Sequence, residues 1–277
     1  MTWPCCADLT DVMRPAITLT HDGPVLDLND SSLGRLRADW SARHCVVLER
    51  FLDPRLVAAV RRQIASGTFG AFVHEESGHE AKMDDNAAVW LLDFLMNGPE
   101  LLQAIGRVTD RPVTWFHGRV YRLTPGTDEG HDWHKDYEIG RQIGVSVNLT
   151  EGAFAGGVLQ LRDAVTKVTL SEVANTGSGD GVIFRLGDDV QHRVLPVTGH
   201  VARLAFAGWF YTGPTLRERL VHRLDFRGQW LNARTQRASM RAARHGGTGA
   251  PAPTPRPSRR DPDHRSANPR CRCRGRR

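Results

Sequence analysis

The stretch His131-Asp132-Trp133-His134-Lys135-Asp136 is followed by His192, which lies 56 positions beyond Asp136. Residues i and i+2 of an extended strand point to the same side, so His134 and Asp136 can share one metal ion. His192 must then arrive from a distant strand. Two imidazoles and one carboxylate are the ligands that hold a non-haem Fe(II) and leave coordination positions open. A His-x-Asp tripeptide alone is weak evidence, because a surface histidine beside a solvated carboxylate is common, so the context decides.

The sequence around this stretch predicts short strands separated by glycine-containing turns. Residues 118–123 form a β-rich run that ends in the turn signal Thr124-Pro125-Gly126, and residues 143–149 alternate apolar with small or polar side chains. Further strands are predicted at 158–161 after Gly156-Gly157, at 182–184 after Gly179-Asp180-Gly181, at 192–198 and at 201–210. This pattern is typical of a β-sandwich or jelly roll.

Taken in order, these motifs resemble the Fe(II)/2-oxoglutarate-dependent oxygenases of the prolyl-hydroxylase-like superfamily. The shared features are a Tyr-containing strand, His-x-Asp, a Gly-Gly strand, a Gly-x-x-Phe strand, His-x-Val-x-Pro-Val and a downstream Arg. The resemblance covers residues 46–210, with its decisive motifs between 119 and 209. It implies a mainly β fold with flanking helices (α+β) and a double-stranded β-helix, or jelly-roll, core.

The resemblance makes His134, Asp136 and His192 the catalytic metal ligands. Arg203, 11 positions after His192, matches the basic residue that pairs with the distal carboxylate of 2-oxoglutarate. Arginine suits this role because its planar guanidinium meets a carboxylate through two parallel hydrogen bonds and stays charged when dry. The alternative is a strand arginine whose head reaches solvent.

Three further residues are weaker candidates for the co-substrate pocket. Tyr121 matches a phenol that lines this pocket in the family, while Arg119 and Asn148 occupy neighbouring strand positions that could face the same cavity. A strand tyrosine is more often a core residue with its hydroxyl at the rim. His131 lacks a carboxylate two positions later, so we expect it to line the loop over the iron.

The implied cofactors are Fe(II), 2-oxoglutarate and O₂, with succinate and CO₂ as co-products of substrate oxidation. Related halogenases replace the ligand carboxylate with a small residue, whereas Asp136 is present here, which favours hydroxylation. Desaturation and cyclisation remain open. The residues Asp132, Trp133, Lys135, Glu138 and Arg141 suggest an amino acid, a peptidyl or carrier-bound residue, or a polar small molecule as the substrate.

Helices are predicted ahead of the core. Asp53 can cap a helix that begins at Pro54, and others are expected across 87–96 and 99–108, each packing an apolar stripe on the sheet. The polar segment 74–80, which contains His74, His79 and Glu80, is predicted to be a lid or solvated loop between helices, with metal binding as the alternative.

Composition predicts a soluble cytoplasmic enzyme. The 277 residues are 40% hydrophobic and contain no apolar run long enough to cross a membrane. The start has no basic segment followed by an apolar one, and the five cysteines, at positions 5, 6, 45, 271 and 273, suggest neither a disulfide framework nor a zinc site. We expect an N-terminal extension over 1–42 and the oxygenase domain over 43–238.

Residues 239–277 are predicted to be a disordered Arg/Pro-rich tail. From position 241 onward it carries 11 Arg and 2 Asp, so the remaining 240 residues hold a net charge of −3 out of the total of +6. Such a tail could bring the core to nucleic acid, which is the alternative function, but it has no aromatic residue to stack on bases. Alkylated-base repair dioxygenases carry a second Arg six positions after the first, where this chain has Trp209. A non-enzymatic jelly-roll binding module would require the His-Asp-His set to be accidental.

Overall fold

The computed structural model describes residues 15–74, 77–136, 140–174 and 176–212. The chain divides into two units, residues 1–219 and 220–277, and every described residue belongs to the first. The predicted tail and the first 14 residues of the predicted extension therefore lie outside the described residues.

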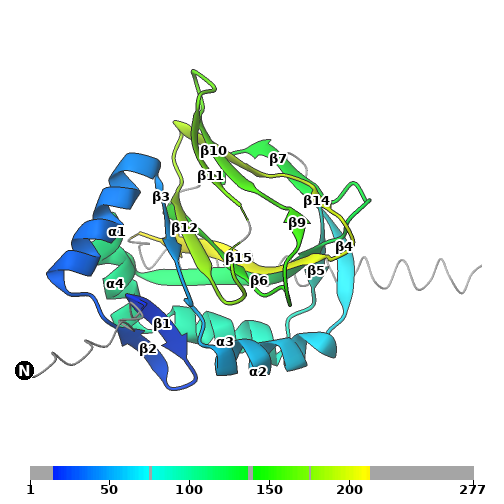
Figure 1. Cartoon of the computed structure of the whole chain (residues 1–277), viewed down its shortest axis with the longest axis horizontal. Helices are drawn as coiled ribbons and strands as arrows, with labels where there is room; N and C mark the ends of the chain where they lie inside the picture. The colour runs from blue at the N-terminus through cyan, green and yellow to red at the C-terminus, as the bar shows by residue number, and fades with distance from the viewer. Residues whose placement is uncertain (1–14, 75–76, 137–139, 175, 213–277) are drawn as a thin grey trace, which may run out of the picture. The chain divides into compact units, whose positions relative to one another are not determined.

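One large antiparallel sheet curls round on itself and forms the body of the fold (Figure 1). Along the sheet the order is β11-β10-β13-β7-β5-β6-β15-β8-β12-β3, with β4 paired to β5. The strands are β3 Cys45–Leu48, β4 Phe69–His74, β5 Gly78–Met83, β6 Trp115–Leu123, β7 Gly130–His134, β8 Arg141–Asn148, β10 Leu159–Asp163, β11 Thr169–Val173, β12 Gly181–Arg185, β13 Val190–Val194 and β15 Arg203–Tyr211. Two short strands, β9 Ala155–Gly156 and β14 Val197–Thr198, pair separately. The jelly-roll prediction is confirmed.

The helices lie outside the curved sheet (Figure 1): α1 Asp30–Arg43, α2 Pro54–Ala65, α3 Ala87–Met96 and α4 Pro99–Thr109. The Asp53 side chain accepts a hydrogen bond from the Leu56 N–H and Pro54 takes the first turn, as predicted. Part of the predicted extension is built into this layer, because the hairpin β1 Ile17–Thr20/β2 Gly23–Leu26 and α1 add apolar side chains to the same core. Among the described residues, none of the helices is both long and apolar enough to span a bilayer.

Alternation along β15 separates this core from the inside of the sheet. Phe206 and Phe210 are fully buried on the helix side, packed with Phe116. Side chains two residues apart point the same way, so Arg203, Ala205, Ala207 and Trp209 face inward. The small alanines leave space between the two large residues, and that space becomes the cavity described below.

The segment 74–80 differs from its prediction as a loop between helices. It includes the end of β4 and the start of β5, which pair with each other, and β5 also pairs with β6 and β7. Glu80 is only 1% exposed because β5 lies within the sheet and turns this side chain inward. The alternation of Glu80 and Lys82 with Ala81 and Met83 was the available signal, but the neighbouring charges obscured it.

Candidate active site

A cavity of about 330 Å³ opens inside the sheet, lined mainly from β6, β7, β8, β13 and β15. Six of the seven residues that the sequence predicted as metal ligands or co-substrate contacts line this cavity: Arg119, Tyr121, His134, Asp136, His192 and Arg203. Asn148 is the seventh and is absent from this lining. Lys135 and Arg141, which the sequence placed near the site, also face the cavity.

His134, Asp136 and His192 converge at this cavity. His134 ends β7 and lies directly opposite His192 on β13 in the antiparallel register, and their ring centroids are 4.2 Å apart. The Nε2 atom of His134 is 3.4 Å from Asp136 Oδ1, and that of His192 is 3.3 Å from Asp136 Oδ2. One donor atom from each residue lies within 4.8 Å of the other two. A single divalent ion can therefore reach all three.

Neighbouring groups orient this set. His134 Nδ1 is 2.6 Å from the Asp132 carbonyl oxygen, to which it donates, and this tautomer leaves Nε2 free as a ligand atom. Trp209 Nε1 donates to Asp136 Oδ2 at 2.9 Å. Burial acts to raise the pKa of Asp136, but the two histidine side chains beside it outweigh burial and hold this pKa well below its usual value. Burial lowers the pKa of His192, which favours the neutral, ligating imidazole.

Arg203 is buried at the other end of the inward face of β15. Its Nη1 donates to Tyr121 Oη at 2.6 Å and its Nη2 to Ser146 Oγ at 2.9 Å. Among the described residues no carboxylate forms an ion pair with it, although the residue is only 6% exposed. A buried cation without a counter-ion is costly, so this position favours an anionic ligand.

Local geometry makes room for this arginine. Gly157 has φ +61°, a conformation that glycine adopts without strain, and a Cβ there would lie 2.9 Å from Arg203 Cδ. Gly157 of the Gly-Gly motif therefore leaves room for the Arg203 side chain. Ser146 was missed by the sequence interpretation, although it lies two positions before Asn148 and so shares its strand face.

Asn148 faces a smaller hollow that it shares with Arg203. Its Nδ2 donates to the carbonyl oxygens of Thr176 and Gly177 at 2.7 and 3.1 Å, and its Oδ1 accepts from the Thr150 N–H at 2.9 Å. These bonds hold the loop before β12 against β8.

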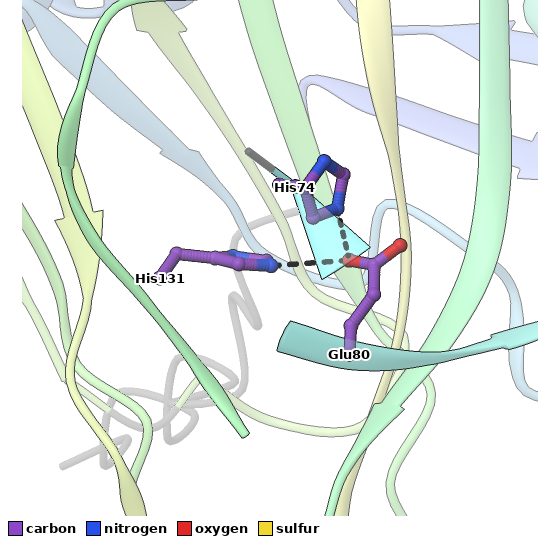
Figure 2. Close-up of side chains that lie close together, drawn as sticks. All are labelled: His74, Glu80 and His131. Atoms are coloured by element: carbon purple, nitrogen blue, oxygen red, sulfur yellow. Dashed lines mark hydrogen bonds and ion pairs between the residues drawn. The ribbon is translucent and has the colours of Figure 1, made fainter. Parts of the chain in front are cut away.

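Arg119 is tied to a buried carboxylate. Its Nε and Nη2 donate to the two oxygens of Glu80 at 2.6 and 3.0 Å. His131 and His74 both point at Glu80 Oε2, at 3.1 and 3.4 Å (Figure 2). Burial acts to raise the pKa of Glu80, but Arg119 and the two histidines hold it well below its usual value. His131 therefore belongs to this cluster, although its ring centroid is also 6.0 Å from that of His134.

His74, Glu80 and His131 have the composition and spacing of a second metal site. The position of Arg119 makes a metal ion at this second site unfavourable. Its Nη2 is 3.0 Å from Oε2. A cation bound to that oxygen at about 2.1 Å would lie within about 5 Å of the guanidinium, a repulsion of roughly 7 kcal/mol at an effective dielectric of about 20. The cluster is already satisfied as a hydrogen-bonded ion pair.

Aromatic residues mark the borders of the site. Trp133 is not among the residues that line the cavity: the guanidinium carbons of Arg162 and Arg193 lie 4.0 and 4.5 Å from its ring centroid. Trp209 does line the cavity, and Arg141 lies over its ring at 4.3 Å. Asp132 is exposed, and Glu138 lies outside the described residues.

Comparison with known proteins agrees with this geometry. Residues 117–211 match the model of the 2OG-Fe(II) oxygenase superfamily. No curated protein matches the chain.

A Pseudomonas putida prolyl-4-hydroxylase is 23% identical to this chain, with a TM-score of 0.50. The match covers 66% of this chain and 100% of the solved chain. A 2OG-Fe(II) oxygenase family protein from Burkholderia pseudomallei is 12% identical, with a TM-score of 0.54, and the match covers 70% of this chain and 97% of the solved chain. The non-haem α-ketoglutarate-dependent epimerase SnoN from nogalamycin biosynthesis is 15% identical, with a TM-score of 0.52, and the match covers 66% of this chain and 84% of the solved chain. At these identities the structures show a shared fold. Residues 117–211 of this chain are therefore similar to the 2OG-Fe(II) oxygenase superfamily, and the three solved structures share the fold of the chain.

Proposed function

We propose that this protein is an Fe(II)- and 2-oxoglutarate-dependent dioxygenase that hydroxylates an amino acid, a peptidyl residue or a polar small molecule, releasing succinate and CO₂. The observation that carries the proposal is the buried Arg203, without an acidic partner among the described residues, in the same cavity as His134, Asp136 and His192. One end of the cavity can hold a cation and the other an anion.

His134, Asp136 and His192 would hold the iron. The donor set fits, because the three atoms converge and Asp132 fixes His134 with Nε2 toward the site. Trp209 occupies one lone pair of Asp136 Oδ2 and so fixes the angle at which the carboxylate meets the ion. When bound, the iron supplies the activation of O₂ that couples 2-oxoglutarate decarboxylation to substrate oxidation.

Arg203, Tyr121 and Ser146 would bind the distal carboxylate of 2-oxoglutarate. The guanidinium is held by the two hydroxyl groups, which can also donate to an incoming carboxylate by rotating their O–H bonds. Ala205 and Ala207 are short, so the co-substrate has space to extend along the sheet from Arg203 toward the iron ligands.

Hydroxylation is favoured by the carboxylate of Asp136, which keeps a ligand position that would otherwise be open to halide. The same fold carries other outcomes, since SnoN is described as an epimerase. The nucleic-acid alternative rests on the basic tail, which lies outside the described residues.

The test is substrate-independent formation of succinate from 2-oxoglutarate, measured together with bound iron. His134→Ala, Asp136→Ala and His192→Ala should each lose Fe(II) and succinate formation, because two remaining ligands hold the ion too weakly. His21→Ala is the matched control, since His21 is exposed on the β1–β2 turn. Full turnover in any two of the three variants would contradict the assignment.

A further inference from the structure

The cavity carries more cationic side chains than the iron and co-substrate use. Among its described lining residues the cations are Arg119, Lys135, Arg141 and Arg203, while Asp136 is the acid. The proposed function assigns Asp136 to Fe(II) and Arg203 to 2-oxoglutarate. Asp136 and the Glu80 that pairs with Arg119 offset two of these four positive charges, and the charges of Fe(II) and of the 2-oxoglutarate dianion cancel formally. The described side chains therefore leave a net positive charge, which favours an anionic group on the substrate.

Arg119 is held firmly while part of its guanidinium stays unused. Nε and Nη2 are engaged by Glu80, but within the described part of the chain no hydrogen bond engages Nη1. His74 and His131 hold the same carboxylate from further directions (Figure 2), so the Arg119–Glu80 pair has little freedom to turn. A guanidinium fixed in this way presents N–H donors to a carboxylate at a small entropy cost.

The Arg119 guanidinium lies near the iron ligands. Arg119, Trp209 and Arg141 come from the neighbouring strands β6, β15 and β8, and the two guanidinium carbons lie 5.2 and 4.3 Å from the Trp209 ring centroid. The same indole donates to Asp136 Oδ2. The Arg119–Trp209–Arg141 group therefore borders the metal ligands at the end of β15 away from Arg203.

We propose that Arg119, with Arg141 beside it across Trp209, binds a carboxylate group of the substrate next to the iron. This inference rests on the proposed function and narrows its substrate class to carboxylate-bearing molecules oxidised near that group. A free α-carboxylate and an acidic side chain offer the same chemistry, and the experiment separates them.

The experiment uses the full chain loaded with Mn(II) and 2-oxoglutarate. Mn(II) is paramagnetic and broadens the NMR signals of small molecules that bind near it. One probe pair is N-acetyl-leucine and its amide, which tests the α-carboxylate. The other is N-acetyl-glutamate α-amide and N-acetyl-glutaminamide, which tests a side-chain carboxylate. In at least one pair the acid should be broadened at a concentration about tenfold or more below that of its neutral partner. Equal broadening within both pairs, or none by either acid, overturns the proposal.

Variants assign the effect to Arg119. Arg119→Gln should abolish the preference for the acid, whereas Arg122→Gln should keep it, because Arg122 is an exposed residue one position from Tyr121 on the opposite face of β6. If Arg119→Gln fails to fold, Arg119→Lys, which keeps the charge without the fork, should reduce the preference. An unchanged preference in a folded Arg119 variant overturns the proposal.

Titration with Mn(II) separates two other failures. A second bound equivalent that disappears in His74→Ala would overturn the proposal, since a cation on Glu80 would displace Arg119. Failure of the unmodified chain to bind Mn(II) and 2-oxoglutarate would contradict the proposed function itself. Normal binding of both without any acid preference would contradict the substrate inference alone.

Discussion

Arg119, which is partly buried, and Arg203, which is buried, line one cavity but have different surroundings. Arg119 has a carboxylate partner in Glu80, whereas Arg203 is held by the hydroxyl groups of Tyr121 and Ser146. Arg119 has a counter-ion and keeps Nη1 for a further acceptor, whereas Arg203 has no acidic partner among the described residues and favours an anionic ligand. Both arginines were visible in the sequence, but the partners that distinguish them come from strands 39 and 57 or more residues away, so no local pattern could assign them.

Removing Glu80 should destabilise the protein strongly. Glu80→Ala removes the buried counter-ion of the partly buried Arg119, and we expect a loss of about 3–5 kcal/mol in the free energy of unfolding by urea at neutral pH. Glu151→Ala, at an exposed position, should change it by less than about 0.5 kcal/mol. Equal effects of the two substitutions would show that the Arg119–Glu80 pair does not support the fold.

The lowered pKa of Glu80 predicts that the stability of the protein depends on pH. The pKa of Glu80 is held well below its ordinary value of 4.5, so its stabilising contribution is complete above that value and is lost as the pH falls toward the pKa in the folded state. The stability of the unmodified protein should therefore fall more steeply below pH 4.5 than that of Glu80→Ala. Parallel curves from urea unfolding across this range would contradict the assignment.

At the scale of elements, α2, α3 and α4 were predicted from the sequence, whereas α1 and the β4–β5 hairpin were not. The apolar stripe, Asp53 cap and Pro54 indicated α2 locally, and 87–96 and 99–108 agree with α3 and α4 to within one residue. The hairpin was hidden because buried Glu80 is stabilised by side chains on β6 and β7, which a local pattern cannot include. The sequence likewise predicted that His192 comes close to His134, but it did not predict that β13 pairs with β7.

The two faces of β15 should respond differently to substitution. Phe206→Ala removes a fully buried side chain on the helix side and should cost about 3–5 kcal/mol of unfolding free energy. Ala207→Leu instead adds volume to the cavity floor between Arg119 and Ser146, and should weaken 2-oxoglutarate binding more than it lowers stability. Thermal melts and calorimetric titration with 2-oxoglutarate would test this, and weak binding in Phe206→Ala with normal binding in Ala207→Leu would reverse the assignment of the faces.

At the scale of the whole molecule, the helices and part of the described sheet share one hydrophobic cluster, and a second cluster of buried residues is separate from it. The first cluster includes Ile17, Leu19, Leu33, Leu36 and Trp40. The −3 charge of the first 240 residues contrasts with the basic remainder. Composition identified this contrast, but it could not show that β1, β2 and α1 join the core, because their apolar residues are few and their contacts are distant in sequence.

A chain that ends at Ser239 should keep the melting temperature and the 2-oxoglutarate turnover of the full chain. The removed segment has few apolar residues to bury and so should add little folding free energy. Any nucleic-acid binding by the full chain should be indifferent to sequence and weaken as salt rises. Loss of turnover on truncation, or tight binding of one nucleic-acid sequence at physiological salt, would favour the nucleic-acid alternative.

The most direct test of the central claim is the visible charge-transfer absorption that appears when Fe(II) and 2-oxoglutarate bind each other in one site, recorded without O₂. We predict that the unmodified chain forms this band and that Asp136→Ala does not. Arg203→Gln should need at least about tenfold more 2-oxoglutarate, the loss expected for a charge-assisted pair, while Arg122→Gln should need no more than the unmodified chain. Absence of the band in the unmodified chain, or an unchanged 2-oxoglutarate requirement in Arg203→Gln, would contradict the account.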